Sequence, residues 1–213
     1  MSKPSENTDA RTREKLSDYS FERPIPRAVR EFGKAIDPKI LEPGDLLLVA
    51  HKNPKWHSKL IVQQQQKQFP DEHACWHHAA VCGGGFEICE ATVGGVKAYE
   101  YWDYMNARFD VRVRRLKNAA PDQRSRVAYY AATNVNTGYG FLSLPALASF
   151  LSNGNPWGRR LLSSSGVVCS QLYFEACMRA GFLLAPISSD QVCPAHLSIT
   201  PHMVDVPLSW IPV

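Results

Sequence analysis

The order of predicted elements is one helix, a block of strands and then helices, which indicates an α+β protein. Two features carry this prediction. Trp76–Cys82 and Phe86–Ala91 have the pattern of strands on either side of a glycine-rich turn, which is the signature of a β-hairpin. Far downstream, an amphipathic helix is expected from Cys169 to about Ala180, with Gly181 as its C-cap. We therefore expect an antiparallel sheet packed against the helix that carries Cys169.

The segment before the hairpin supplies four further predictions. Residues 1–23 are mostly polar and charged, so we expect a disordered or loosely attached arm. A short helix is expected over Arg27–Ala35. The turn Glu42-Pro43-Gly44 precedes a short apolar run, Asp45–Ala50, which is typical of a buried strand. Helix-forming residues over Ser58–Phe69 predict a helix.

The segment after the hairpin begins with strands and ends without regular structure. Lys97–Tyr101 is expected to be a strand, and the alternation of apolar and charged residues over 109–114 predicts a half-buried strand. A helix is expected from Asp122 to about Asn134. Residues 134–158 are rich in Gly, Asn and aromatic residues and predict an inserted loop containing a helix. Five prolines between Pro186 and Pro212 predict an extended, loop-like tail.

The composition is that of one ordinary globular domain, which we place over residues 24–213. The chain has 213 residues, of which 45% are hydrophobic and 21% are charged, enough to form a sizeable core. The net charge of +4 predicts weak attraction to anions rather than the basic face of a nucleic-acid-binding protein. No nucleic acid partner is therefore expected.

The sequence also predicts where in the cell the protein is located. No apolar run approaches the ~18–20 residues of a membrane span, so no stable membrane insertion is expected. Residues 1–23 lack the apolar region of a secretory signal peptide. We therefore expect a protein made and folded in the cytoplasm, with secretion by a non-Sec route as the alternative.

The six cysteines are expected to be free thiols, because the chain is large enough to have a full hydrophobic core and has no export signal. Cys169 differs from the others in its setting. It follows the polar turn 164–168 and begins a helix, whose free N–H groups and positive dipole end stabilise a thiolate. The thiolate is the nucleophilic form of cysteine, so Cys169 is the candidate nucleophile.

The predicted hairpin offers the other two groups that a cysteine hydrolase needs, a base and a group that orients the base. His78 lies on one strand, on the same face as Ala80 and Cys82, and these small residues would let the Cys169 helix pack close. Glu90 ends the apolar face of the next strand, where a carboxylate needs a partner. An imidazole N–H would supply one and would leave the other ring nitrogen free for Cys169.

Several motifs together resemble the NlpC/P60 hydrolases, a papain-like group. Gly44-Asp45-Leu46-Leu47 resembles the Gly-Asp pair that opens a strand in that family. His78-Ala79-Ala80-Val81 resembles its histidine strand, and Cys89-Glu90-Ala91-Thr92, with the following Gly95-Val96, resembles its third motif. Cys169-Ser170-Gln171-Leu172-Tyr173 resembles the Cys-Ser-Glu-Leu-Val motif of the circularly permuted branch, and Ser198-Ile199-Thr200-Pro201 is also similar to that branch. The resemblance covers roughly residues 40–206.

The resemblance implies a circularly permuted papain-like fold in which the nucleophile comes last in the chain. It implies that Cys169 is the nucleophile, His78 the general base and acid, and Glu90 the orienting group. The backbone N–H of Cys169 would contribute to the oxyanion hole. Tyr139, in the loop Gly138-Tyr139-Gly140, is a candidate substrate contact. The alternative interpretation is that Tyr139 is an aromatic residue of the core.

Other interpretations exist for some of these residues. His77 could be the base instead of His78, although the face it shares with Ala79 and Val81 looks buried. Structural zinc is another interpretation, because four possible ligands lie close together in the sequence, namely His73, Cys75, His77 and His78. Cys193 and His196 also have a plausible ligand spacing. However, neighbouring histidines point to opposite faces of a strand and there is no paired Cys-x-x-Cys spacing, so no metal or other cofactor is expected.

Two further motifs are weaker evidence for a functional site. Gly83-Gly84-Gly85 could be a phosphate loop, but no Lys-Ser/Thr follows it and no helix starts there. A nucleic-acid-binding patch could be formed by Arg112, Arg114 and Arg115. The default interpretation of these arginines is a solvated strand face.

The predicted function is that of a cysteine peptidase or amidase, which cleaves a peptide or isopeptide bond through an acyl-enzyme. The resemblance implies peptidoglycan stem peptides as substrates, and delivery as a toxin effector would bring an immunity or secretion partner protein. The first alternative is an acyltransferase, or a thioester or lipid-ester hydrolase, with the same triad, because the apolar segment 141–151 could line an acyl groove. The second is a non-catalytic binding module that keeps the fold.

Overall fold

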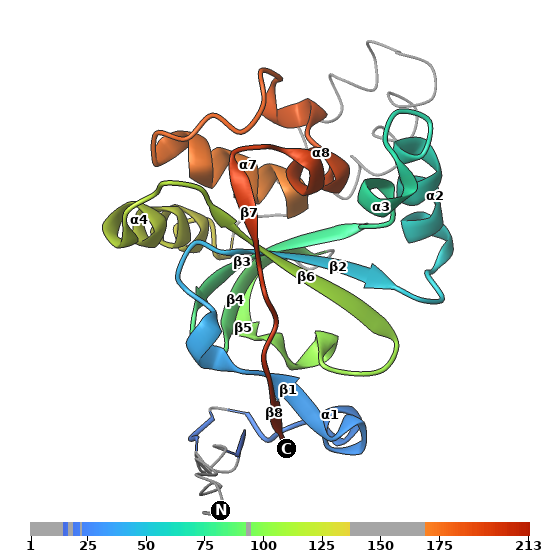
Figure 1. Cartoon of the computed structure of the whole chain (residues 1–213), viewed down its shortest axis with the longest axis vertical. Helices are drawn as coiled ribbons and strands as arrows, with labels where there is room; N and C mark the ends of the chain where they lie inside the picture. The colour runs from blue at the N-terminus through green and yellow to red at the C-terminus, as the bar shows by residue number, and fades with distance from the viewer. Residues whose placement is uncertain (1–14, 17–18, 22, 93–94, 137–168) are drawn as a thin grey trace, which may run out of the picture.

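The computed structural model describes residues 15–16, 19–21, 23–92, 95–136 and 169–213 (Figure 1). Its centre is a six-stranded sheet with the strand order β5-β4-β3-β2-β6-β7. All neighbouring strands in this sheet run antiparallel. The prediction of an α+β protein with an antiparallel sheet is therefore confirmed.

The main sheet consists of β2 (Leu46–His51), β3 (His78–Gly84), β4 (Glu87–Thr92), β5 (Gly95–Glu100), β6 (Phe109–Leu116) and β7 (Met203–Val206). A second sheet pairs β1 (Lys34–Ile36) with β8 (Trp210–Pro212). The helices are α1 (Arg27–Phe32), α2 (Trp56–Gln65), α3 (Asp71–Ala74), α4 (Pro121–Ala132), α7 (Cys169–Arg179) and α8 (Pro194–Ile199). No helix in these described ranges is both long and apolar enough to cross a membrane.

Alternate side chains of the central strands point into two separate cores, because successive side chains of a strand lie on opposite faces of the sheet. Leu46 and Leu48 of β2 point into the first core, which also contains buried residues of α4, α7 and α8. Leu47 and Val49 point into the second core, with β1, β8 and the 3₁₀ turn Tyr101–Tyr104. Figure 1 shows the same division, with α4, α7 and α8 on one side of the sheet and the small sheet on the other.

The backbone at Gly44 brings the helices onto the start of β2. Gly44 has a φ of 83°, a left-handed conformation that favours glycine. Its carbonyl accepts a 3.0 Å hydrogen bond from the hydroxyl of Tyr173 in α7. A Cβ at this position would overlap the backbone carbonyl of Arg124 in α4. Glycine here therefore allows both helices to approach the sheet closely.

Asp45, the next residue, has no exposed surface. It accepts hydrogen bonds from the Glu42 N–H at 2.9 Å and from Nε and Nη2 of Arg115 at 2.8 and 2.7 Å. A buried carboxylate must be paired in this way. The Gly-Asp pair thus joins the start of β2 to β6 as well as to the helices.

The helix expected over Ser58–Phe69 is observed as α2 over Trp56–Gln65, and two other predicted elements also differ from the structure. The helix expected over Arg27–Ala35 ends at Phe32, because Gly33 adopts a left-handed φ of 74° and its N–H caps the Val29 carbonyl. The tail is not simply extended, since it contains α8 and two strands. Pro194 occupies the first turn of α8, where its missing N–H costs nothing.

The described residues of the N-terminal segment, which we expected to be a loose arm, contact the domain. Leu16 is completely buried in the second core. The rings of Tyr19 and Phe21 pack edge-on against Phe86, at centroid distances of 5.1 and 4.8 Å. These three apolar side chains attach the described part of the segment to the domain. The predicted insert over 134–158 lies outside the described residues from 137 onward.

Candidate active site

Cys169 is the first residue of α7, and its side chain is buried against the start of β3 (8% of the residue is exposed). The backbone N–H groups of Ala79 and Ser170 donate hydrogen bonds to its sulfur. Five buried residues of α7 hold this helix on the sheet, namely Leu172, Tyr173, Phe174, Ala176 and Cys177. The sulfur is therefore held at the junction of a helix start and a strand start, where N–H groups are available.

His78 is the first residue of β3 and lies between Cys169 and Glu90. Its Nε2 is 2.6 Å from Oε2 of Glu90, and its side chain also hydrogen-bonds the Cys169 thiol. Because Nε2 is engaged by the carboxylate, Nδ1 is the ring nitrogen left for the sulfur. The structure thus brings the three predicted residues into one hydrogen-bonded chain from sulfur to carboxylate.

The pKa shifts of these three groups have the directions that favour a thiolate beside an imidazolium. Burial raises the pKa of Cys169, but the His78 charge and the hydrogen bonds to the sulfur outweigh it, and the net pKa is lowered. Burial lowers the pKa of His78, but the charges of Glu90 and Cys169 outweigh it, and the net pKa is raised well above its ordinary value. Opposite charges in hydrogen-bond contact favour both charged forms.

Glu90 remains a carboxylate although only 1% of it is exposed. Burial acts to raise its pKa, but the charge of His78 and hydrogen bonds from His78, Tyr104 and Tyr99 lower it overall. The hydroxyl of Tyr104 donates to Oε2 at 2.6 Å, and the hydroxyl of Tyr99 donates to Oε1. A carboxylate that accepts several hydrogen bonds is stabilised as the anion.

Sequence reasoning missed both tyrosines. Tyr99 pairs with Ile88 in the β4–β5 register, so its side chain lies diagonally across from Glu90 on the same face. The alternation Ile88, Glu90 and Tyr99 could have indicated this contact once the register was known. Tyr104 belongs to a 3₁₀ turn and carries no periodic signal that would place it at the site.

The prediction about which small residues accommodate the Cys169 helix was wrong. Ala80 and Cys82, which share a face with His78, belong to the second core. Helix α7 packs instead on Ala79 and Val81, which belong to the first core. Cys169 reaches His78 because each is the first residue of its element, and the start of α7 lies at the end of β3 where that strand begins.

The other candidate residues have structural partners. Nε2 of His77 accepts the His51 N–H at 2.8 Å, so His77 binds the neighbouring strand. Within the described ranges, no three metal-ligating side chains come together. Arg112 and Arg114 pair with Asp205, whereas Arg115 pairs with Asp45. Tyr139 lies outside the described residues.

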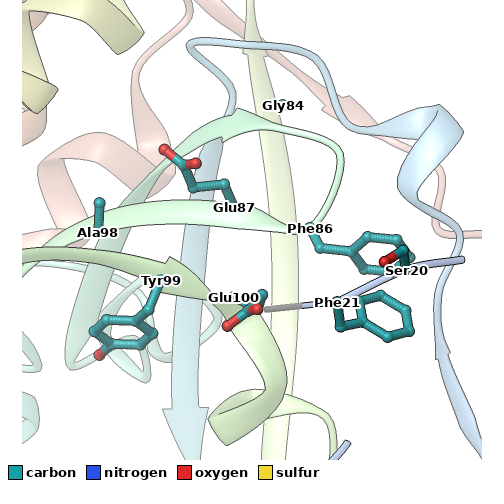
Figure 2. Close-up of a pocket in the computed structure, with 8 residues that line it drawn as sticks. All are labelled: Ser20, Phe21, Gly84, Phe86, Glu87, Ala98, Tyr99 and Glu100. Carbon is teal, nitrogen blue, oxygen red and sulfur yellow. The ribbon is translucent and has the colours of Figure 1, made fainter. Parts of the chain in front are cut away.

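A separate pocket of about 240 Å³ lies where β4 and β5 meet the N-terminal segment (Figure 2). Its lining includes Phe21, Phe86, Glu87 and Glu100, but none of Cys169, His78 and Glu90. Tyr99 also lines it, and this residue connects the pocket to the site because its hydroxyl reaches Glu90. The pocket therefore adjoins Tyr99, which hydrogen-bonds Glu90, and does not adjoin the thiol of Cys169.

Replacing Tyr104 by phenylalanine is expected to move the acid limb of Cys169 alkylation to higher pH. The variant loses one donor to Glu90, so the pKa of Glu90 rises and the carboxylate loses its charge at a higher pH. A hydrogen bond to a charged group is worth about 1.5–3 kcal/mol. The acid limb should therefore move by at most about one to two pH units. The measurement is the pH dependence of Cys169 alkylation.

The matched control for this variant is Tyr101→Phe. Tyr101 lies on the same 3₁₀ turn, and its hydroxyl donates to the Ile36 carbonyl at 2.7 Å rather than to Glu90. The Tyr101 variant should therefore keep the wild-type pH profile. Equal profiles for the wild type and the Tyr104 variant would show that Tyr104 has no influence on the charge of Glu90.

Comparison with known proteins adds no relative to this description, because no family model and no curated protein matches the sequence.

Proposed function

We propose that this protein is a thiol hydrolase that cleaves an amide bond through a covalent acyl-enzyme. The observation that carries the proposal is the hydrogen-bonded chain of Cys169, His78 and Glu90, in which the 2.6 Å contact fixes the imidazole. The lowered pKa of Cys169 and the raised pKa of His78 provide a nucleophile and a proton donor in contact with each other. Nucleophile, base and orienting group are the three parts that such catalysis requires.

The chemistry follows from this arrangement. The Cys169 thiolate attacks the carbonyl carbon and forms a tetrahedral intermediate, whose oxyanion the Cys169 backbone N–H would stabilise. The His78 imidazolium then gives its proton to the departing amine, which leaves a thioester on Cys169. Next, His78 takes a proton from water as the water oxygen attacks the thioester, the C–S bond breaks, and the carboxylic acid leaves, which restores the Cys169 thiolate beside the His78 imidazolium. Glu90 keeps its charge throughout and holds the ring in one orientation.

For the fold family, we infer the circularly permuted, papain-like NlpC/P60 branch. The chain order supports this inference, because β2, β3 and β4 come first and α7, with the nucleophile, follows in the C-terminal part. The resemblance then makes peptidoglycan stem peptides the first substrates to test. A toxin effector of this kind would be exported by a non-Sec route and would have an immunity partner.

Peptide amides are to be tested before thioesters and lipid esters because the resemblance to the NlpC/P60 hydrolases implies them. The apolar segment 141–151, on which the acyl-groove alternative depends, lies outside the described residues. Both reactions pass through the same acyl-enzyme. The mass of an adduct trapped on Cys169 distinguishes them, because a peptidyl adduct supports the amidase and a fatty-acyl adduct supports the alternative.

Selective alkylation of Cys169 by iodoacetamide tests the proposed thiolate without knowledge of the substrate. Since the pKa of Cys169 is lowered, the thiolate forms below the ordinary free-thiol value of ~8.5. At a pH of about 6, Cys169 is expected to react at least about tenfold faster than an ordinary thiol. Peptide mapping by mass spectrometry after short exposures gives the rate at each cysteine.

Cys75 is the internal reference in that experiment. It is partly exposed, and burial raises its pKa, so its reaction should require alkaline pH. If Cys169 and Cys75 react at the same rate and over the same pH range, Cys169 is not activated. The non-catalytic binding module would then replace the hydrolase as the best interpretation.

A further inference from the structure

A second cysteine–histidine pair lies at the start of α8. Sγ of Cys193 is 3.0 Å from Nδ1 of His196, and the Cys193 backbone N–H donates to the same nitrogen at 3.2 Å. The thiol is almost completely buried. All six cysteines lie in the described ranges, and of these Cys169 and Cys193 are the ones whose thiols hydrogen-bond to an imidazole.

This pair lies beside the candidate nucleophile. The Ser170 hydroxyl donates to the Val192 carbonyl at 2.9 Å, and this bond joins the residue after Cys169 to the residue before Cys193. The negative charge of Cys169 also acts on Cys193 through space. Both thiols are buried, each has an imidazole partner, and they lie near enough to each other for the charge of one to act on the other.

The two cysteines differ in their protonation. Burial, followed by smaller effects that include the Cys169 charge, raises the pKa of Cys193 to about 11. Cys193 is thus a neutral thiol that does not compete with Cys169 as a nucleophile. Burial lowers the pKa of His196, so its ring is neutral near pH 7 and Nδ1 can accept a proton.

We propose that Cys193 and His196 form a resolving pair that captures an oxidised Cys169 as a reversible disulfide. A hydroperoxide oxidises the Cys169 thiolate to a sulfenic acid, and the alcohol or water derived from the peroxide leaves. The Cys193 sulfur then attacks the Cys169 sulfur as His196 takes the thiol proton. The S–O bond breaks, the departing hydroxide takes up a proton to become water, and the Cys169–Cys193 disulfide remains.

The consequence is protection of the active site. An unresolved sulfenic acid is oxidised further to the sulfinic acid, which ordinary thiol reductants do not restore. A disulfide blocks activity but is reversed by such reductants. The site would therefore be switched off, rather than destroyed, by peroxide. This inference rests on the thiolate at Cys169 that the proposed function requires.

The test uses the full chain and hydrogen peroxide as the oxidant. The reduced protein is first alkylated in a short pulse to establish that Cys169 is reactive, and a second sample is oxidised, blocked and mapped by mass spectrometry. We expect a Cys169–Cys193 cross-link and full recovery of Cys169 reactivity with dithiothreitol. In Cys193→Ser, we expect sulfinic acid at Cys169 and at least a tenfold smaller recovery.

Two further variants complete the design. Cys75→Ser removes a partly exposed thiol that contacts the Glu72 carbonyl, and it should behave as the wild type. His196→Gln keeps Cys193 but removes the base, so the cross-link should form about tenfold more slowly, and this variant serves if the Cys193 variant does not fold. A reactive Cys169 that forms no cross-link to Cys193 overturns this inference alone. An unreactive Cys169 in the first pulse overturns the proposed function as well.

Discussion

Replacing Cys169 by alanine is expected to abolish the proposed amide hydrolysis, with turnover falling by at least about 10⁴-fold. No other described thiol is in hydrogen-bond contact with His78, so nothing can take over the attack on the carbonyl carbon. The measurement is turnover of an amide that the wild type cleaves, beginning with peptidoglycan stem peptides. The trapped acyl-enzyme should disappear in the same variant.

Cys75→Ala is the control for this experiment, because Cys75 is a thiol outside the triad. It should retain wild-type turnover. A Cys169→Ala variant that folds, as judged by its circular dichroism and melting temperature, and still hydrolyses the substrate would remove Cys169 from the mechanism.

Glu90→Gln is expected to have the second largest effect, a loss of about 10²–10⁴-fold in turnover. The amide has no charge to stabilise the imidazolium, so the pKa of His78 falls and that of Cys169 rises. The three groups that now donate to the carboxylate, on His78, Tyr99 and Tyr104, would face an amide that cannot accept from all of them as well. The acid limb of Cys169 alkylation should move up toward the ordinary thiol range.

Glu87→Gln is the matched control, with the same substitution on the same strand. Glu87 is exposed and lies opposite Glu100 in the register of β4 and β5. This variant should leave both turnover and the alkylation profile unchanged. If Glu90→Gln also left both unchanged, Glu90 would be a structural carboxylate without influence on His78.

Much of the candidate site could be predicted because its residues have strong local signals. The glycine turn and the period of two placed His78 and Glu90 on neighbouring strands. The turn before Cys169 and the amphipathic pattern after it placed the thiol at a helix start. Each of these signals depends on residues within one element, which is the range over which sequence patterns are informative.

Other parts of the site depend on contacts between elements that are far apart in the chain. The supporting role of Tyr104 arises because a 3₁₀ turn packs beside β4, and no repeat in the sequence encodes that packing. Cys193 and His196 have a spacing that is plausible for metal ligands, whereas the structure places them near Cys169. The N-terminal segment looked solvated because its few apolar residues are dispersed. In the structure, however, Leu16 and Phe21 pack into the second core, which is formed mainly by residues later in the chain.

By itself, the sequence determined the fold class, the hairpin, the helix start at Cys169 and the chemical types of the three candidate site residues. These depend on local backbone preference and on the periodicity of apolar residues. The tertiary structure decided which face of the sheet receives α7, which tyrosines hold Glu90 and which second thiol lies near the first. Register and packing decide such matters, because a contact across the sheet depends on how whole elements align and not on the residues of either element alone.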